Sequence, residues 1–261
     1  MAATLLIKKD KNNSHYLQEK KMTENKLLPV HVAVIMDGNG RWAVKNNVSR
    51  LSGHNAGMLA MKEIIKREDI LGIKYLTVYA FSTENWKRSA EEVGGIFGLL
   101  VKYVASELKE LNDNNVKVSV FGDRSSIPKS AQISIDKAID TTKDNDGLGF
   151  NIALNYGSRQ EIVRAAKRLA ELAAEGRIKP DDIDEQYFAK YLYTGDENGN
   201  IPDPDLIIRT SGEERISNFL LWQSAYSELA FSDSLWPDFT PDEFEKIIEE
   251  YTRRNRRFGG R

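Results

Sequence analysis

The sequence has no cysteine among its 261 residues, which excludes disulfide bonds and metal sites built on thiolates. It also has no apolar run near the ~20 residues that a membrane-spanning helix requires. Neither sign of charge dominates, because 37 Lys and Arg residues stand against 39 Asp and Glu residues, and the net charge of -2 gives no general attraction to nucleic acid. The first residues place a short apolar patch before the charges, the reverse of a secretory signal. We therefore expect a cytoplasmic protein without a nucleic-acid partner.

The alternation of strand-like and helix-like segments predicts an α/β fold. Strands separated by helices imply right-handed crossovers, and so a single domain with a mostly parallel six-stranded sheet flanked by helices. The expected strands are 30–36, 74–81, 116–121, 150–155, 206–209 and 229–231. The expected helices are 54–71, 91–111, one that opens at Pro128, 159–174 and one that runs from Thr240 to about Arg253.

Three segments fall outside this pattern. Residues 1–27 are polar, Lys-rich and without a clear period, which predicts a flexible arm before a domain that covers 28–261. Residues 195–204 read as a loop by their turn residues. The aspartates of 181–184 resemble a magnesium motif, but they follow Pro180 and precede a helical pattern, so we interpret them as helix caps.

The first expected strand ends in the sequence DGNGRW at 37–42, which suits a phosphate ligand. Two glycines let backbone amides approach closely, while a helix start beyond them and Arg41 add positive potential. Asp37 would repel a phosphate unless a divalent cation lay between them, and Mg²⁺ binds one or two carboxylates together with phosphate oxygens. Arg50 and His54 follow closely and are candidates for a second phosphate oxygen. The spacing alone fits a plain glycine turn with a surface aspartate equally well.

Two further strand ends carry polar residues. The segment 82–88 combines hydrogen-bonding groups with the large apolar face of Trp86, although a turn before a helix explains it as simply. The segment 209–218 has two arginines and several hydroxyls, which suit a second anion site. The alternative there is a surface loop whose glutamates pair with its arginines. Glu228, before the sixth strand, is a candidate second metal carboxylate, although a lone Glu is usually solvated.

Six motifs, in this order, resemble the cis-prenyltransferase family, above all the bacterial undecaprenyl diphosphate synthases. They are HVAVIMDGNGRWA (31–43), GHNAGM (53–58), YAFSTENWKR (79–88), NYGSRQEI (155–162), DPDLIIRTSGEERISNFLLWQ (203–223), and ELAF with LWPDF (228–239). The resemblance covers about 28–261. The chain departs from the family in its arm and in a longer, more acidic loop at 195–201, and neither contains a motif residue.

The resemblance implies a homodimeric catalytic domain that condenses isopentenyl diphosphate with an allylic diphosphate, expected to be farnesyl diphosphate, with Mg²⁺ as cofactor. The product it implies is undecaprenyl diphosphate for the lipid carrier of cell-wall synthesis, and we then expect transient contact with the membrane surface for product release. The growing chain needs an apolar tunnel, for which the helix 91–111, Ala80 and Gly98 are candidates. The alternative is that this helix stripe is ordinary core.

The resemblance also implies roles by motif position. Asp37 holds magnesium at the allylic diphosphate, Glu228 matches the second acidic metal position, and Asn85 is the family's proposed proton acceptor. Because a neutral amide is a poor base, we expect Asn85 to position a water or a pyrophosphate oxygen instead. The tail residues Arg257 and Gly259 match a segment that reaches the partner subunit's active site. The residues implied at the allylic diphosphate are Gly38, Asn39, Gly40, Arg41, Trp42, Arg50 and His54. Those implied near both substrates or at isopentenyl diphosphate are Ser82, Thr83, Glu84, Trp86, Arg88, Arg209, Arg215, Ile216 and Ser217.

Two other classes of protein compete with this interpretation. A non-catalytic scaffold subunit of the same fold should lack the Asp37 loop or Asn85, and both are present. A kinase or phosphatase would need a Walker lysine or a catalytic phosphate acceptor, and the sequence has neither motif.

Overall fold

The structure is a computed structural model that describes residues 28–254, so the predicted arm and the predicted tail residues Arg257 and Gly259 lie outside it. In this range six strands form one all-parallel sheet in the order β3-β4-β2-β1-β5-β6, which confirms the predicted fold class. The strands are β1 (His31–Ile35), β2 (Tyr75–Ser82), β3 (Lys117–Phe121), β4 (Gly149–Tyr156), β5 (Leu206–Arg209) and β6 (Glu228–Phe231).

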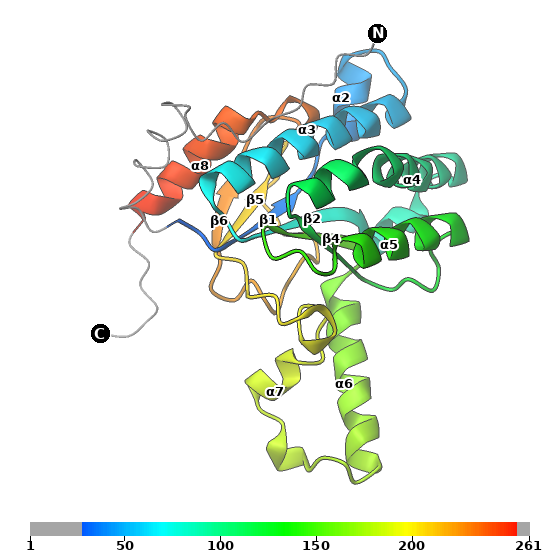
Figure 1. Cartoon of the computed structure of the whole chain (residues 1–261), viewed down its shortest axis with the longest axis vertical. Coiled ribbons are helices and arrows are strands. Elements are labelled where there is room, and N and C mark those ends of the chain that lie inside the picture. The colour runs from blue at the N-terminus through cyan, green and yellow to red at the C-terminus, as the bar shows by residue number, and fades with distance from the viewer. Residues whose placement is uncertain (1–27, 255–261) are drawn as a thin grey trace.

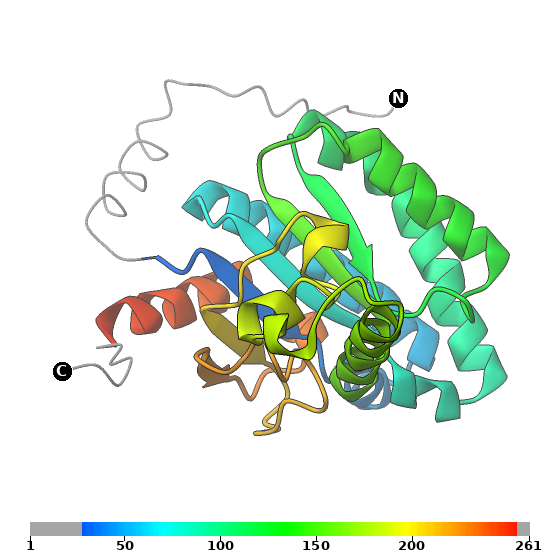
Figure 2. The same ribbon diagram turned by 90° about the horizontal axis from the view of Figure 1, so that it is seen from below.

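Helices cover both faces of this sheet (Figure 1). The helices α3, α4, α5 and α8 pack on one face, while α6 and α7 extend from the other, where α6 points toward the viewer in Figure 2. The seven α-helices of the described chain are α2 (Asn39–Lys45), α3 (Arg50–Leu71), α4 (Ala90–Asp113), α5 (Lys129–Thr142), α6 (Ser158–Ala174), α7 (Glu185–Ala189) and α8 (Pro241–Arg253).

The strands are apolar on both sides because both faces of the sheet are buried. In β1, Val32 and Val34 point to the large core beneath α3, α4 and α8. Ala33 and Ile35 point to a smaller cluster, formed with aromatic residues such as Phe219 from the segment after β5. The continuous apolar run of β1 therefore places alternate side chains in the two apolar clusters, one on each face of the sheet.

The strand order places the site. The chain moves from β1 to β2 on one side and later returns to pair β5 on the other side of β1. Ligands of open parallel sheets bind where the strand order reverses in this way, outside the carboxyl ends of the strands. Asp37 follows β1 and Arg209 ends β5, so both lie at this reversal.

Two sequence predictions for helices were wrong in detail. The helix predicted at 54–71 begins at Arg50, because Ser49 caps it by accepting a hydrogen bond from the backbone N–H of Ser52. The glycine-rich turn contains a helix of its own, α2, that the sequence reading missed. The aspartates of 181–184 do act as caps, since Asp182 and Asp184 accept backbone hydrogen bonds at the starts of two short helical turns.

Candidate active site

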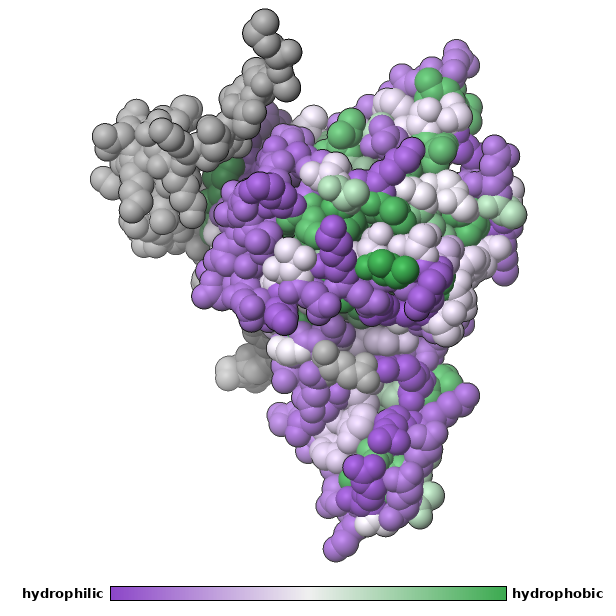
Figure 3. Space-filling model, turned by 45° about the vertical axis from the view of Figure 1, so that its right-hand side comes forward, coloured by the Kyte–Doolittle hydropathy of each residue, from purple (hydrophilic) through white to green (hydrophobic). Residues whose placement is uncertain are grey.

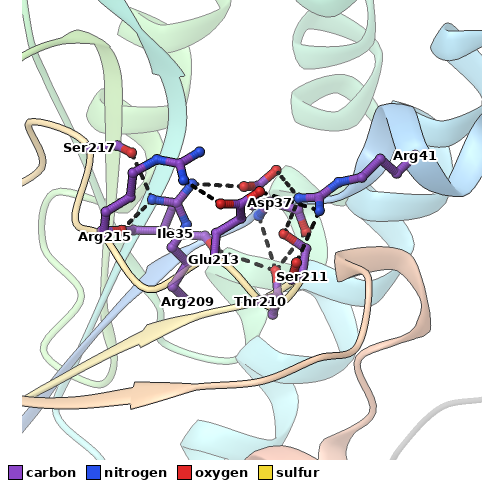
Figure 4. Close-up of polar contacts among 9 residues, drawn as sticks. All are labelled: Ile35, Asp37, Arg41, Arg209, Thr210, Ser211, Glu213, Arg215 and Ser217. Carbon is purple, nitrogen blue, oxygen red and sulfur yellow. Dashed lines mark hydrogen bonds and ion pairs between the residues drawn. The ribbon is translucent and has the colours of Figure 1, made fainter.

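Asp37 lies between two arginines at the carboxyl end of β1 (Figure 4). Arg209 Nη2 donates to Asp37 Oδ2 at 2.8 Å, and Arg41 Nη2 is 3.3 Å from Asp37 Oδ1. Partial burial opposes ionisation, but the two guanidinium groups outweigh it and hold the pKa of Asp37 below its ordinary value. Asp37 is therefore an anion at neutral pH, with a side chain that is 30% exposed.

The backbone of this loop is fixed from both sides. The backbone N–H of Asp37 donates to the Thr210 hydroxyl at 3.1 Å, and its carbonyl accepts from that hydroxyl and from the Trp236 N–H. Gly38 then turns into α2 with a φ of 112°, and a Cβ there would meet backbone atoms of Leu235 and Trp236 at 3.0 Å. Glycine is thus required by conformation and by space.

Arg209 connects Asp37 to the loop that follows β5. It is buried, and its Nη1 donates to Ser217 Oγ at 2.7 Å and to the backbone carbonyl of Arg215. Because a guanidinium presents its donors in a rigid planar arrangement, Arg209 alone holds Asp37 and the loop of Arg215 and Ser217 in fixed positions. Arg215 itself is exposed and pairs with Glu213, which also lies 3.6 Å from Arg41. The alternative of glutamate–arginine pairing is therefore correct for Arg215 and not for Arg209.

A second group of basic side chains comes from α3 and from the residues just before α4. Its centre is Glu92, whose Oε1 accepts from Arg88 at 2.8 Å and contacts His54 Nε2 at 3.2 Å, while Oε2 is 3.6 Å from Arg50. Burial lowers the pKa of His54 more than Glu92 raises it. Burial also opposes the ionisation of Glu92, but these neighbours hold its pKa below the usual range. The sequence analysis did not single out Glu92 as a site residue.

Asn85 is held in a short 3-10 turn after β2. Its Oδ1 accepts the backbone N–H of Ser82 at 3.0 Å. Trp86 packs against Phe97, and its indole N–H donates to Asn155 at 2.7 Å, so contacts within the protein fix its position.

Two adjoining polar cavities, of about 510 and 420 Å³, collect most of the predicted residues. Their walls share Asp37, Asn39, His54 and Arg88. The other predicted residues in their walls are Gly38, Gly40, Arg41, Arg50, Ser82, Glu84, Asn85, Arg209 and Ser217.

Five predicted substrate residues of the described chain lie outside these walls, and Trp86, described above, is one of them. Trp42 donates to Asp238 at 2.7 Å on the outer side of α2. Thr83 contacts Gln160 at 3.3 Å. Ile216 packs against the smaller apolar cluster, and Arg215 faces solvent. None of these side chains therefore lines the two polar cavities.

An apolar cavity of about 80 Å³ continues from the polar ones. It begins at Met36, Asn39 and His54 and follows α4 toward Leu111. Ala80 lines it, beside a register shift in the pairing of β2 with β4. The prediction for Gly98 was wrong, because Gly98 is exposed on the opposite side of α4.

Glu228 does not reach Asp37 in one chain. It begins β6 and pairs in register with Leu206, at the amino end of the sheet, whereas Asp37 lies at the carboxyl end. Its side chain instead accepts from Arg254 at 2.9 Å. Asp37 and Glu228 of a single chain are therefore not placed to bind the same ion, and the role of Glu228 as a second metal carboxylate stays a prediction.

The side chains around Asp37 fit a Mg²⁺ ion that takes most of its oxygen ligands from a bound phosphate group and from water. Among residues 28–254 no three His, Asp or Glu side chains are grouped as a metal site. Magnesium often binds one carboxylate with phosphate oxygens and waters, and Asp37 supplies that carboxylate. The amide oxygen of Asn39, buried without a hydrogen-bond partner in the same walls, is a further acceptor.

A family model described as putative undecaprenyl diphosphate synthase matches residues 35–259. The chain belongs to this cis-prenyltransferase family. It is 50% identical over 243 residues to an isoprenyl transferase of Clostridium perfringens, with 93% of this chain and 94% of that one covered. It is also 50% identical to an isoprenyl transferase of Bacillus subtilis, over 89% and 88% of the two chains.

Solved structures of the family have the same fold. Lavandulyl diphosphate synthase from Lavandula x intermedia, in complex with dimethylallyl diphosphate, has a TM-score of 0.86 and 38% identity, with 89% of this chain and 99% of that chain covered. A probable undecaprenyl diphosphate synthase from Campylobacter jejuni has a TM-score of 0.72 and 34% identity, with the same coverage. The predicted prenyltransferase class is confirmed by these matches. No helix within residues 28–254 is long and apolar enough to cross a membrane.

Proposed function

We propose that this prenyltransferase condenses isopentenyl diphosphate with an allylic diphosphate, with farnesyl diphosphate as the starter and Mg²⁺ as the cofactor. The observation that carries the proposal is that the two polar cavities around Asp37, which are lined by arginines, continue into the apolar cavity. A substrate with a diphosphate head and a hydrocarbon tail needs both surroundings in that order.

The proposed roles follow from position. The start of α2, with Gly40 and Arg41, and the side chains of Arg50 and His54 hold the allylic diphosphate, whose tail enters the apolar cavity. Arg209 and the loop of Arg215 and Ser217 hold isopentenyl diphosphate on the other side. Holding both substrates in line is an orientation effect worth up to about 7–11 kcal/mol in well-aligned systems.

In the proposed reaction the allylic C–O bond breaks, a new C–C bond forms to isopentenyl diphosphate, and one proton leaves. Arg41, Arg50 and the first backbone amides of α2 stabilise the charge that develops on the departing pyrophosphate. Bound at Asp37, Mg²⁺ would neutralise part of the same charge. Asn85, whose carbonyl is already engaged by Ser82, orients a proton-accepting water or pyrophosphate oxygen through its NH₂ group.

The product, assembly and location are proposed from the family. We infer a cis-polyprenyl product, undecaprenyl diphosphate for the cell-wall lipid carrier, made in the cytoplasm with transient membrane-surface contact at release. For the homodimer, support comes from the edge strand β6, where Leu229 and Phe231 are 41% and 39% exposed beside Tyr226 at 74%. An apolar edge of this kind needs a cover.

Incubation with farnesyl diphosphate, radiolabelled isopentenyl diphosphate and Mg²⁺ tests the proposal. We expect labelled polyprenyl diphosphates, their loss on chelation of the metal, and a loss of at least about 100-fold in rate for Asp37→Ala. Glu214→Ala, on an exposed side chain outside the cavities, is the control. Full activity of Asp37→Ala, or no incorporation by the wild type, would contradict the proposal; the second result would favour the scaffold alternative.

A further inference from the structure

The loop of residues 211–220, which follows β5, is held in a costly backbone conformation. Four of its non-glycine residues have a positive φ, between 45° and 79°: Ser211, Ser217, Asn218 and Leu220. This left-handed region is sterically unfavourable for residues with a Cβ, and it persists only where surrounding contacts hold it. Ser217 and Asn218 line the larger polar cavity. The contacts that hold these two residues therefore decide the shape of one wall of the site.

Asn218 joins this loop to the start of α6. Its backbone carbonyl accepts from the N–H of Ser158 at 2.8 Å, and its Oδ1 accepts from the N–H of Arg159 at 2.9 Å. The Ser158 hydroxyl also accepts from the N–H of Leu221 at 3.0 Å. Helix α6 begins at the body of the molecule and projects from it as part of a narrow, mostly hydrophilic extension (Figure 3). These contacts place the first turn of α6 against the loop.

The amide NH₂ group of Asn218 faces the turn that carries Asn85. Its Nδ2 donates to Glu84 Oε1 at 3.3 Å and to Gln160 Oε1 at 3.2 Å. Gln160 in turn donates from Nε2 to the Thr83 hydroxyl at 3.3 Å. Asn218 therefore contacts the residue that immediately precedes Asn85 in the chain.

The space around Gly157 shows how closely these segments meet. A Cβ on Gly157 would lie 2.4 Å from Gln160 Oε1. It would also lie 2.8 Å from Asn218 Nδ2 and from Thr83 Oγ1. Unstrained contacts of carbon atoms lie near 3.5–4.0 Å, so a single methyl group would push these side chains apart. The segments that follow β2, β4 and β5 thus meet at one junction, formed by Thr83, Gly157, Gln160 and Asn218.

We propose that Asn218 is a positioning residue that ties the loop 211–220 to the Asn85 turn. The inference rests on the proposed function, in which Arg209 and Ser217 hold isopentenyl diphosphate and Asn85 orients the proton acceptor. Arg209 holds the loop from one side, through Ser217 and a backbone carbonyl. Asn218 holds it from the other side. With both contacts in place, bound isopentenyl diphosphate and the group that accepts its proton keep a fixed relation to each other.

Steady-state kinetics with farnesyl diphosphate and radiolabelled isopentenyl diphosphate test the proposal. Asn218→Gly removes only the side chain, because glycine adopts the left-handed backbone without strain. We expect KM for isopentenyl diphosphate to rise about tenfold, as the loss of one or two hydrogen bonds predicts, and kcat to fall. KM for farnesyl diphosphate should stay unchanged. Gly157→Ala, which inserts a methyl group into the junction, should act in the same direction.

A conservative variant and a matched control separate positioning from general stability. Asn218→Asp keeps the Oδ1 that accepts from Arg159, but it places a carboxylate beside Glu84 where the amide donated. It should therefore lower kcat more than it raises KM for isopentenyl diphosphate. Asn115→Gly is the control, since Asn115 also has a positive φ, of 61°, and its side chain joins two segments through Asp146. It follows α4, outside the polar cavities, and should leave the kinetics unchanged.

Wild-type kinetics from Asn218→Gly, with normal thermal unfolding, would overturn the positioning role and leave the proposed function intact. An equal rise in both KM values would also overturn it, because that pattern indicates general loosening of the site. Lack of incorporation of label by the wild type would overturn both. If Asn218→Gly does not fold, Asn218→Asp decides, and an unchanged kcat in that variant would refute the tie to the Asn85 turn.

Discussion

His31 gives a prediction whose size follows from its surroundings. Its side chain is fully buried in β1. The Pro202 carbonyl can only accept, so Nδ1 carries the proton in their 2.6 Å hydrogen bond. Nε2 then accepts from the Thr77 hydroxyl at 2.7 Å, and Thr77 in turn accepts from Asn151. A second proton on the ring would disrupt this chain of hydrogen bonds.

Burial lowers the pKa of His31 to about 4, against the opposing effects of the Pro202 carbonyl and the Asp205 charge. In the unfolded chain the pKa is about 6.5, so the unfolded state binds the extra proton first as pH falls. The stabilisation is complete above pH 6.5 and is lost as pH falls toward 4. From these two pKa values we expect the free energy of unfolding to fall by about 2 kcal/mol between pH 8 and pH 5 through His31 alone.

The assay is urea unfolding followed by circular dichroism at pH 8, 7, 6 and 5, for the wild type and His31→Gln. The wild type should lose its advantage over the variant progressively below pH 6.5. His54→Gln is the control, because the pKa of His54 is lowered too and its contribution must be separated. A difference between wild type and His31→Gln that stays constant from pH 8 to pH 5 would refute the reasoning.

Three further predictions concern single side chains. Glu68 of α3 is fully buried, neither carboxyl oxygen has a partner, and burial raises its pKa well above the usual range. Glu68→Leu should therefore stabilise the protein by about 1–3 kcal/mol at pH 8. The gain should be smaller near pH 4, because the carboxyl of the unfolded chain is then protonated too. Equal gains at both pH values in urea unfolding would contradict this. Ala80→Leu should shorten the products by filling the apolar cavity, as chromatography would show, and unchanged lengths would remove Ala80 from its wall. Glu92→Gln should raise KM for the allylic diphosphate roughly tenfold by releasing Arg88 and His54, with Glu91→Gln as control, and an unchanged KM would argue against it.

The sequence was sufficient for the sheet because its strands carry a strong local signal. Continuous apolar runs such as Val32 to Ile35 are buried on both faces, as expected for a strand inside a parallel sheet. Helix α2 gave no such signal. It is seven residues long, has Gly40 in its first turn, and depends on its N-cap Gly38 fitting against Leu235, a contact between residues almost 200 positions apart.

The candidate site divides in the same way. Residues that follow a strand directly, such as Asp37 and Arg209, were predictable because parallel strands end at one edge. Glu92 was not, because its role depends on His54 reaching it from another helix. Glu228 is the opposite case: the sequence placed it before its strand, and the pairing with Leu206 puts it at the amino edge of the sheet, away from Asp37.

Under the proposed function, charge balance explains why a site for two diphosphates would include the carboxylate of Asp37. Asp37 and Glu92 neutralise part of the charge of Arg209, Arg41 and Arg88 when the site holds no anion. Two diphosphates carry more negative charge than the remaining cations offset, so binding both requires a further cation. Under the proposed function Asp37 is the side chain placed to bind it, since it lies between both groups of arginines and its pKa is already held below the usual range. Substituting Asp37 would then remove the position of that cation and leave the arginines, which separates loss of the metal from loss of diphosphate binding.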